Sequence, residues 1–290
     1  MFIDIHAHAY RDPRASTIGN LPFSRPDQLL AIYDRVGIER GVVLPLVSPE
    51  VYLPQSTEDI LEFAEKSGGR LIPFCNVDPR ALTNSPDAPL GDVLRHYRDR
   101  GCKGIGEVMP NLPFLDPLVQ NLFKHVQDVG FPLIFDITTR IGSAYGLYDD
   151  VGLPQLERCL QKFPDLIILG HGPPFWAHIA QLESPADMAG YTNYPVKAEG
   201  VVPGLFRRYP NLYGDLSAGS GYNALARDRD YAARFLNEFT DRLLFGTDIC
   251  GPDSPTPLVD LLVELKDARK ISEEVFDKIA RGNAIRLLAL

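Results

Sequence analysis

The sequence predicts a (β/α)8 barrel, the TIM-barrel fold, as one domain over residues 1–290. Two observations lead to this prediction: eight short apolar segments recur along the 290 residues, and stretches with helical spacing alternate with them. Near-continuously apolar strands joined by helices are typical of a parallel sheet covered on both faces. A closed barrel of eight such units takes about 250 residues. The length of the chain therefore fits a single barrel.

The eight predicted strands are apolar and β-branched, and glycine, proline or asparagine bounds several of them. In chain order they are FIDIHAH (2–8), GVVLPLV (41–47), LIPFCNV (71–77), KGIGEVM (103–109), FPLIFDI (131–137), DLIILGH (165–171), NLYGDLS (211–217) and DRLLFGTD (241–248). Between them, apolar residues three and four apart predict helices that include 57–69, 118–130, 153–165 and 272–290. Strand and helix therefore alternate throughout the chain.

The composition excludes several classes of partner. The net charge is -9, and lysine and arginine are dispersed, which argues against nucleic acid and favours a small-molecule substrate. No apolar run approaches the ~20 residues of a membrane span, and the N-terminus lacks a secretory signal pattern. The four cysteines include no Cys-x-x-Cys pair, so we expect reduced thiols. We therefore expect a cytoplasmic protein that acts without membrane contact, as a monomer or a homo-oligomer.

The first predicted strand carries two histidines separated by one alanine. Because side chains alternate along a strand, we expect Phe2, Asp4, His6 and His8 on one face, opposite the small and aliphatic residues between them. Two imidazoles would then converge on one spot. Such a pair is either a satisfied polar pair at the end of a strand or part of a metal site, because imidazole is the commonest neutral metal ligand.

Other predicted strands also end in polar residues, and in a barrel the C-terminal ends of strands carry the active site. These residues are His6, His8, Glu107, Asp136, His171 and Asp248. Imidazoles and carboxylates gathered in one concavity would place several charges close together, and a divalent cation neutralises such an arrangement. We therefore expect one or two divalent metal ions at this end of the barrel.

The chain resembles the amidohydrolase superfamily of metal-dependent TIM-barrel enzymes, in particular its amidohydrolase-related branch. The resemblance rests on an ordered set of motifs: DIHAH (4–8), NVDPR (76–80), GIGEV (104–108), LGHG (169–172), LLFGTD (243–248) and GNAIRLLAL (282–290). It implies that His6, His8 and Asp248 bind the metal. Glu107 resembles the acidic ligand on the fourth strand of some relatives.

The fifth strand departs from the pattern of the relatives. Where they have a histidine ligand, this chain has Asp136 in PLIFD. Asp136 then ligates the metal itself, hydrogen-bonds a ligand, or stands in a site that Glu107 completes. Oxygen in place of nitrogen shifts the preference from zinc toward manganese. We expect Zn²⁺, with Mn²⁺ as the alternative.

The resemblance implies a hydrolase that cleaves an amide, lactone or ester-like bond with metal-activated water. Asp248 would accept the proton of the water, and His171 would polarise the carbonyl or bind a second metal. Arg140 and Trp176 are candidate substrate contacts, or else a surface arginine and a packed aromatic side chain. The alternative is a nonoxidative decarboxylase of an aromatic or unsaturated acid, in which Arg140 binds the carboxylate. A noncatalytic binding barrel is the third interpretation.

Overall fold

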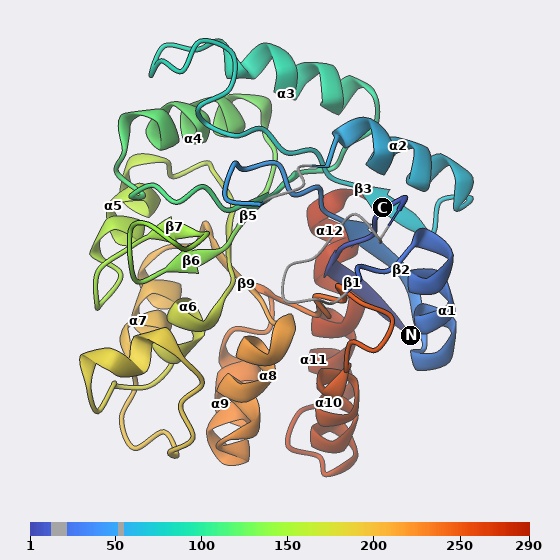
Figure 1. Cartoon of the computed structure of the whole chain (residues 1–290). Helices are drawn as coiled ribbons and strands as arrows, with labels where there is room; N and C mark the ends of the chain where they lie inside the picture. Colours follow the sequence, from blue (N-terminus) through green and yellow to red (C-terminus); the bar gives the residue numbers. More distant parts are fainter. Residues whose placement is uncertain (13–21, 52–54) are drawn as a thin grey trace.

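The computed structural model describes residues 1–12, 22–51 and 55–290, and its central feature is a barrel of parallel strands surrounded by helices (Figure 1). The barrel strands among these residues are β1 (Phe2–Ala7), β2 (Ile38–Val43), β3 (Leu71–Pro73), β4 (Ile105–Val108), β5 (Leu133–Phe135), β8 (Ile168–Gly170), β9 (Leu212–Asp215) and β10 (Leu243–Leu244). The predicted fold class is therefore confirmed.

The barrel is closed at two seams. Hydrogen bonds join β1–β2–β3 into one sheet and β10–β9–β8–β5–β4 into another. A parallel bridge between Cys75 and Ile105 connects β3 to β4, and a second bridge between Ala7 and Ile249 connects β1 to the segment after β10. All eight C-terminal strand ends therefore meet around one mouth.

Most predicted strands are longer than the hydrogen-bonded strands. The segment 241–248, for example, contributes only Leu243–Leu244 to β10, and β2 begins at Ile38 rather than at residue 41. The residues that follow the strands remain buried where the chain leaves the barrel, so an apolar pattern does not mark where pairing ends.

The helices form the outer layer. They are α1 (Pro26–Val36), α2 (Thr57–Lys66), α3 (Leu90–Asp99), α4 (Pro117–Val129), α5 (Pro154–Lys162), α6 (Pro173–Ala177), α7 (Val201–Arg208), α8 (Ala218–Ala226), α9 (Arg229–Glu238), α10 (Pro257–Asp267), α11 (Glu273–Asp277) and α12 (Asn283–Leu288). The predictions over 57–69, 118–130 and 153–165 match α2, α4 and α5. Residues 272–290 form α11, a π-helical turn (Lys278–Gly282) and α12. None of the helices in the described ranges is long and apolar enough to cross a membrane.

Local sequence explains several helix limits. In α4, the Asp116 side chain accepts a hydrogen bond from the backbone N–H of Leu118, Pro117 occupies the first turn, and Gly130 ends the helix with φ 78°. Three short elements interrupt the alternation. The strands β6 (Ile137–Thr138) and β7 (Leu147–Tyr148) pair with each other after β5, and a 3-10 helix, η3 (Pro185–Ala189), follows α6.

The interior of the barrel is apolar where the strands begin. Ile3, Ile5, Leu169 and Leu244 belong to one buried cluster there, and Leu288 of α12 packs against them. The C-terminal helix lies close to β1 in Figure 1. This end of the barrel is therefore filled, and polar side chains gather at the other end.

The predicted alternation along β1 is wrong in its first half. Phe2 packs against Phe276 of α11, and Asp4 accepts a hydrogen bond from the Tyr33 hydroxyl of α1, so both face the helices. Between Asp4 and Ala7 the pairing with β2 shifts by one residue, which is a β-bulge. The bulge reverses the alternation, so that His6 and His8 face the mouth although Asp4 does not.

Candidate metal centre

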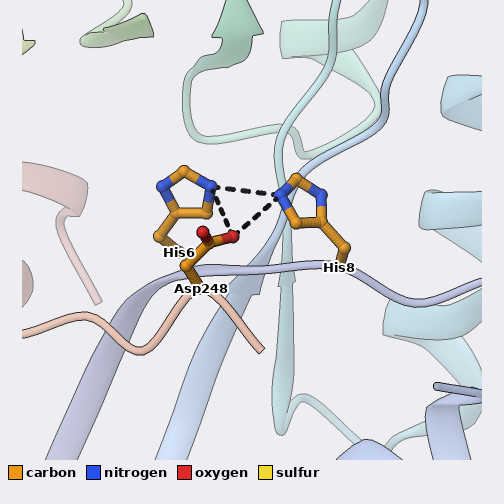
Figure 2. A group of neighbouring side chains, drawn as sticks. All are labelled: His6, His8 and Asp248. Carbon is orange, nitrogen blue, oxygen red and sulfur yellow. Dashed lines mark hydrogen bonds and ion pairs between the residues drawn. The ribbon is translucent and has the colours of Figure 1, made fainter. Parts of the chain in front are cut away.

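His6, His8 and Asp248 meet at the centre of the mouth (Figure 2). The His6 Nε2 and His8 Nε2 atoms are 3.1 Å apart, and Asp248 Oδ1 lies 3.5 Å from the first and 3.4 Å from the second. Both imidazoles are buried, whereas the Asp248 side chain remains 23% exposed. Asp248 has φ 54°, in the left-handed region, and its backbone N–H donates to the His6 carbonyl. Asp248, in the segment after β10, thus lies against the pair from β1.

The partners of the two rings fix which nitrogen carries the proton in the neutral form. His8 Nδ1 lies 3.0 Å from the carbonyl oxygen of Leu44, which only accepts hydrogen bonds. His6 Nδ1 lies 2.7 Å from the Asp215 carboxylate, which also accepts. Both Nδ1 atoms are therefore donors. In the neutral rings, the Nε2 lone pairs face each other and the Asp248 carboxylate.

This arrangement fits a divalent cation. In a tetrahedral zinc site with bonds of about 2.0–2.2 Å, the ligand atoms are about 3.3–3.6 Å apart. The three distances among His6, His8 and Asp248 are 3.1, 3.4 and 3.5 Å. Electron-rich atoms at this spacing repel one another unless positive charge lies between them. The residues present therefore match the donor set of such an ion. The two distances to Asp248 have the required spacing, and the His6–His8 distance is slightly shorter.

Glu107 from β4 is the next carboxylate. Its Oε2 lies 3.7 Å from His6 Nε2 and 3.5 Å from His8 Nε2, and its Oε1 lies 3.8 Å from His171 Nε2. Asn76, in the predicted NVDPR motif, donates a hydrogen bond to the Glu107 carbonyl and so anchors the end of β4. Glu107 thus lies between the first-strand pair and His171.

Asp136 lies at the mouth, as the alternation along the fifth strand predicts. Ile134 belongs to the inner cluster, whereas Leu133 and Phe135 belong to the outer core. Asp136, Glu107 and His171 place ligand atoms within 4.8 Å of one another. A Cβ at Gly172 would collide with Asp136 Oδ1, so the second glycine of LGHG leaves room for this carboxylate.

The charges of the cluster shift one another's pKa values. Burial alone would lower the pKa of His8, but the Asp248 and Glu107 carboxylates raise it to about 9. Burial alone would raise the pKa of Glu107, but the His6 and His8 imidazoles hold it well below its usual value. Burial and the Glu107 carboxylate raise the pKa of Asp136 to about 7. The carboxylates thus favour positive charge on their neighbours, and a divalent cation supplies such charge at the same place.

Asp215, at the end of β9, also belongs to this cluster, although it is not among the residues predicted from the sequence. Its Oδ2 lies 2.7 Å from His6 Nδ1 and 3.2 Å from His171 Nδ1, and the side chain is fully buried. Ser217 places its Oγ 3.0 Å from the same His171 nitrogen. The rule that selected Asp136, a polar residue at the C-terminal end of a strand, also applies to Asp215 in NLYGDLS.

The two candidate substrate contacts differ in position. Arg140 is exposed in the loop between β6 and β7, where its guanidinium donates to the Ser143 carbonyl and pairs with no carboxylate among the described residues. Trp176 is 1% exposed in the outer core, where it packs against Phe175 and Phe235. The expectation that Trp176 lines the substrate pocket is corrected, because β9 separates it from the mouth and its indole N–H donates to the Asp215 carbonyl.

Comparison with known proteins now gives the family. The family model for amidohydrolases matches residues 3–290. The chain belongs to the amidohydrolase family. Enzymes of this superfamily use divalent metals, in agreement with the ligand groups at the mouth. Among curated protein sequences, no match to this amidohydrolase is found.

Solved structures of similar fold include proteins with different reactions. An uncharacterised TIM-barrel protein of Bordetella bronchiseptica is 18% identical, with a TM-score of 0.68 over 99% of this chain and 98% of that one. A 5-carboxyvanillate decarboxylase of Sphingomonas paucimobilis is 16% identical, with a TM-score of 0.62 over 100% and 99%. A probable 2-pyrone-4,6-dicarboxylic acid hydrolase of Acinetobacter baumannii is 13% identical, with a TM-score of 0.60 over 100% and 99%. At these identities the likeness shows the fold.

Proposed function

We propose that this amidohydrolase is a metal-dependent hydrolase that cleaves an amide, lactone or ester-like bond in a small molecule. The observation that carries the proposal is the triangle of His6, His8 and Asp248, whose ligand atoms have the spacing of a metal site. His6 and His8 would hold the ion with their Nε2 atoms, and Asp248 would hold it with its carboxylate. Two imidazoles and a carboxylate are a donor set of catalytic zinc sites, so Zn²⁺ is the proposed ion and Mn²⁺ the alternative.

When bound, such an ion lowers the pKa of a coordinated water toward ~7 and polarises a substrate carbonyl. Asp248 is the residue proposed to transfer the proton of the attacking water. Its carboxylate is the exposed member of the triangle, so that water and substrate both reach it. Asp248 accepts the proton as the oxygen attacks, and it returns the proton to the leaving amine or alkoxide as the scissile bond breaks.

His171 is the residue proposed to act on the oxygen of the substrate carbonyl. Its Nδ1 is within hydrogen-bond distance of Ser217 Oγ and Asp215 Oδ2, and its Nε2 points toward Glu107 across 3.8 Å. Burial and His6 lower the pKa of His171, but the Asp215 and Glu107 carboxylates outweigh them and raise it. An imidazolium in this position stabilises the negative charge that develops on the carbonyl oxygen.

A nonoxidative decarboxylase is the second candidate, and Arg140 favours it. This guanidinium is exposed in the loop between β6 and β7, which follows β5, and pairs with no carboxylate among the described residues, so it is available to bind a substrate carboxylate. His171 would then protonate the ring carbon as carbon dioxide leaves. The similar folds of a decarboxylase and of a probable pyrone hydrolase support keeping both reactions.

Metal analysis followed by a substrate screen tests the proposal. We expect one or two divalent ions per chain, and hydrolysis of a lactone, ester or amide that stops on chelation and returns with Zn²⁺ or Mn²⁺. Release of carbon dioxide from aromatic acids, together with loss of that activity in Arg140→Gln, would replace hydrolysis by decarboxylation. A purified chain that neither contains nor takes up divalent metal would contradict both reactions.

A further inference from the structure

Asp215 makes contacts that the proposed chemistry does not use. We infer that Asp215 is a positioning residue: one buried carboxylate oxygen holds two imidazoles, His6 and His171, with their Nε2 atoms directed into the mouth. The inference rests on the proposed metal centre, because His6 is one of its ligands. Although β9 supplies no ligand, Asp215 on this strand would then affect the affinity for the metal through His6. It would also fix the orientation of His171.

The contacts of Asp215 account for both of its oxygens. Oδ2 lies 2.7 Å from His6 Nδ1 and 3.2 Å from His171 Nδ1, while Oδ1 accepts the backbone N–H of Ser217 at 3.0 Å. Both imidazole Nδ1 atoms lie within hydrogen-bond distance of Oδ2, and Oδ1 accepts a backbone N–H, so the side chain acts as an acceptor toward both rings.

The surroundings hold Asp215 in one place. The Trp176 indole N–H donates to its carbonyl at 2.9 Å, and Gly170 and Leu243 pair with Gly214 beside it. A Cβ at Gly246 would meet Asp215 Oδ1 at 2.7 Å, so the segment after β10 approaches closely because it has glycine there. The buried Trp176 thus supports the mouth through Asp215 rather than by touching substrate.

Because Asp215 Oδ2 lies against the Nδ1 atoms of both rings, it influences the tautomer of each imidazole. An N–H···carboxylate bond at Nδ1 fixes the tautomer of an imidazole and strengthens its Nε2 as a metal ligand. Ser217 gives His171 a second partner, 3.0 Å from Nδ1, whereas Asp215 is the partner of His6 Nδ1. Loss of Asp215 therefore affects the metal, while loss of the Ser217 hydroxyl affects only the His171 side.

The variant Asp215→Asn replaces the shared hydrogen-bond acceptor, Oδ2, by a hydrogen-bond donor. The backbone N–H of Ser217 keeps the amide oxygen at the Oδ1 position, so the amide NH₂ group faces the two rings. His6 must then accept at Nδ1 and carry its proton on Nε2, where no lone pair is left for a metal. We expect the affinity for Co²⁺, followed by its visible absorption bands, to fall about 10–100-fold.

Two further variants serve as controls. Ser217→Ala keeps the carboxylate and is expected to bind Co²⁺ with unchanged affinity and spectrum. Asp149→Asn replaces another buried carboxylate, one that accepts the backbone N–H groups of Gln155 and Leu156 and touches no imidazole. It too is expected to keep the wild-type affinity. A loss in Asp149→Asn equal to that in Asp215→Asn would overturn the inference.

Wild-type protein labelled with ¹⁵N-histidine keeps the inference testable even if Asp215→Asn does not fold. We expect the Nδ1–H tautomer for His6 in zinc-loaded protein, with Nε2 bound to the metal. A folded Asp215→Asn that binds Co²⁺ as tightly as wild type overturns the inference and leaves the metal centre intact. A proton on His6 Nε2 overturns the inference together with the assignment of His6 as a ligand through that atom. Wild-type protein that binds no Co²⁺ would instead defeat the proposed function itself.

Discussion

Two buried histidines seven residues apart have opposite electrostatic surroundings. His171, at the mouth, lies among Asp215, Glu107 and Ser217, and the carboxylates raise its pKa against burial and the nearby His6. His178, after α6, donates from Nδ1 to the Pro174 carbonyl and accepts the Gly152 N–H at Nε2. Burial lowers its pKa, and the bond to Pro174 opposes this only partly. The surroundings of His171 favour its charged form, whereas those of His178 favour its neutral form.

The two histidines belong to two regions of the molecule, the mouth of the barrel and the layer around α6, which differ in how they accommodate polar groups. At the mouth, side chains from strands that are far apart in the sequence surround a point where positive charge is favourable. The layer around α6 satisfies its polar groups with nearby backbone and buries large aromatic rings. Changes at the mouth should therefore alter metal binding more than folding, and changes around α6 should do the reverse.

The double variant His6→Ala, His8→Ala should have the largest effect. It removes two of the three ligands of the proposed site, so we expect the purified protein to contain no metal and to be inactive. The barrel has its own apolar core, so the circular dichroism spectrum should stay that of wild type, unlike small zinc domains that unfold without metal. Elemental analysis and the spectrum test both statements. Full metal occupancy in a folded double variant would refute the assignment of the site.

Phe175→Ala tests the layer around α6. Phe175 is fully buried and packs over Gly170 and against Phe135. Truncation of such a ring typically costs 3–5 kcal/mol of stability, so we expect a loss of about this size in urea unfolding. Metal content should match wild type. A variant with wild-type stability but altered substrate affinity would return this aromatic segment to the substrate pocket.

How far the sequence predicts this site depends on the kind of information each residue needs. The His6–His8 pair follows from local spacing, and the inward direction of Asp136 follows from alternation along one strand. The reversed direction of Asp4 does not, because the β-bulge depends on pairing with β2. The position of Asp215 at the end of its strand also follows from the sequence, but its contact with both His6 and His171 depends on how the strands are arranged in space. The sequence leaves Trp176 open between substrate contact and packing, because an aromatic residue after a strand has the same pattern whether it faces the mouth or the helices.

Asp136→Asn should have a smaller effect than loss of a ligand pair. The side chain faces Glu107 and His171, so its charge contributes to the field around the metal. We expect metal affinity to fall about 10–100-fold if Asp136 acts through a hydrogen-bonded ligand, and further if it ligates directly. Competition with a chelator measures the affinity, and Asp149→Asn is the matched control. An Asn variant with wild-type affinity and turnover would leave Glu107 and His171 as the partners of the first-strand histidines.

His178 provides the smallest expected effect, a dependence of stability on pH. The pKa of His178 is lowered in the fold, so below pH 6.5 the unfolded chain binds a proton that the folded chain does not. The free energy of unfolding contributed by this residue is therefore fully present above pH 6.5. It is lost as the pH falls toward the folded pKa, with a slope of at most about 1.4 kcal/mol per pH unit.

The variant His178→Gln isolates this contribution. Glutamine can still accept the Gly152 N–H but takes up no proton, so the difference in unfolding free energy between wild type and variant should shrink as the pH falls from 7 to 5. The histidines at the mouth are common to both proteins, and their effect cancels in the difference. His96→Gln, exposed on α3, controls for the change of residue type. A difference that stays constant, or grows toward pH 5, would show that His178 is not held neutral and that carboxylates are not what distinguishes the two histidines.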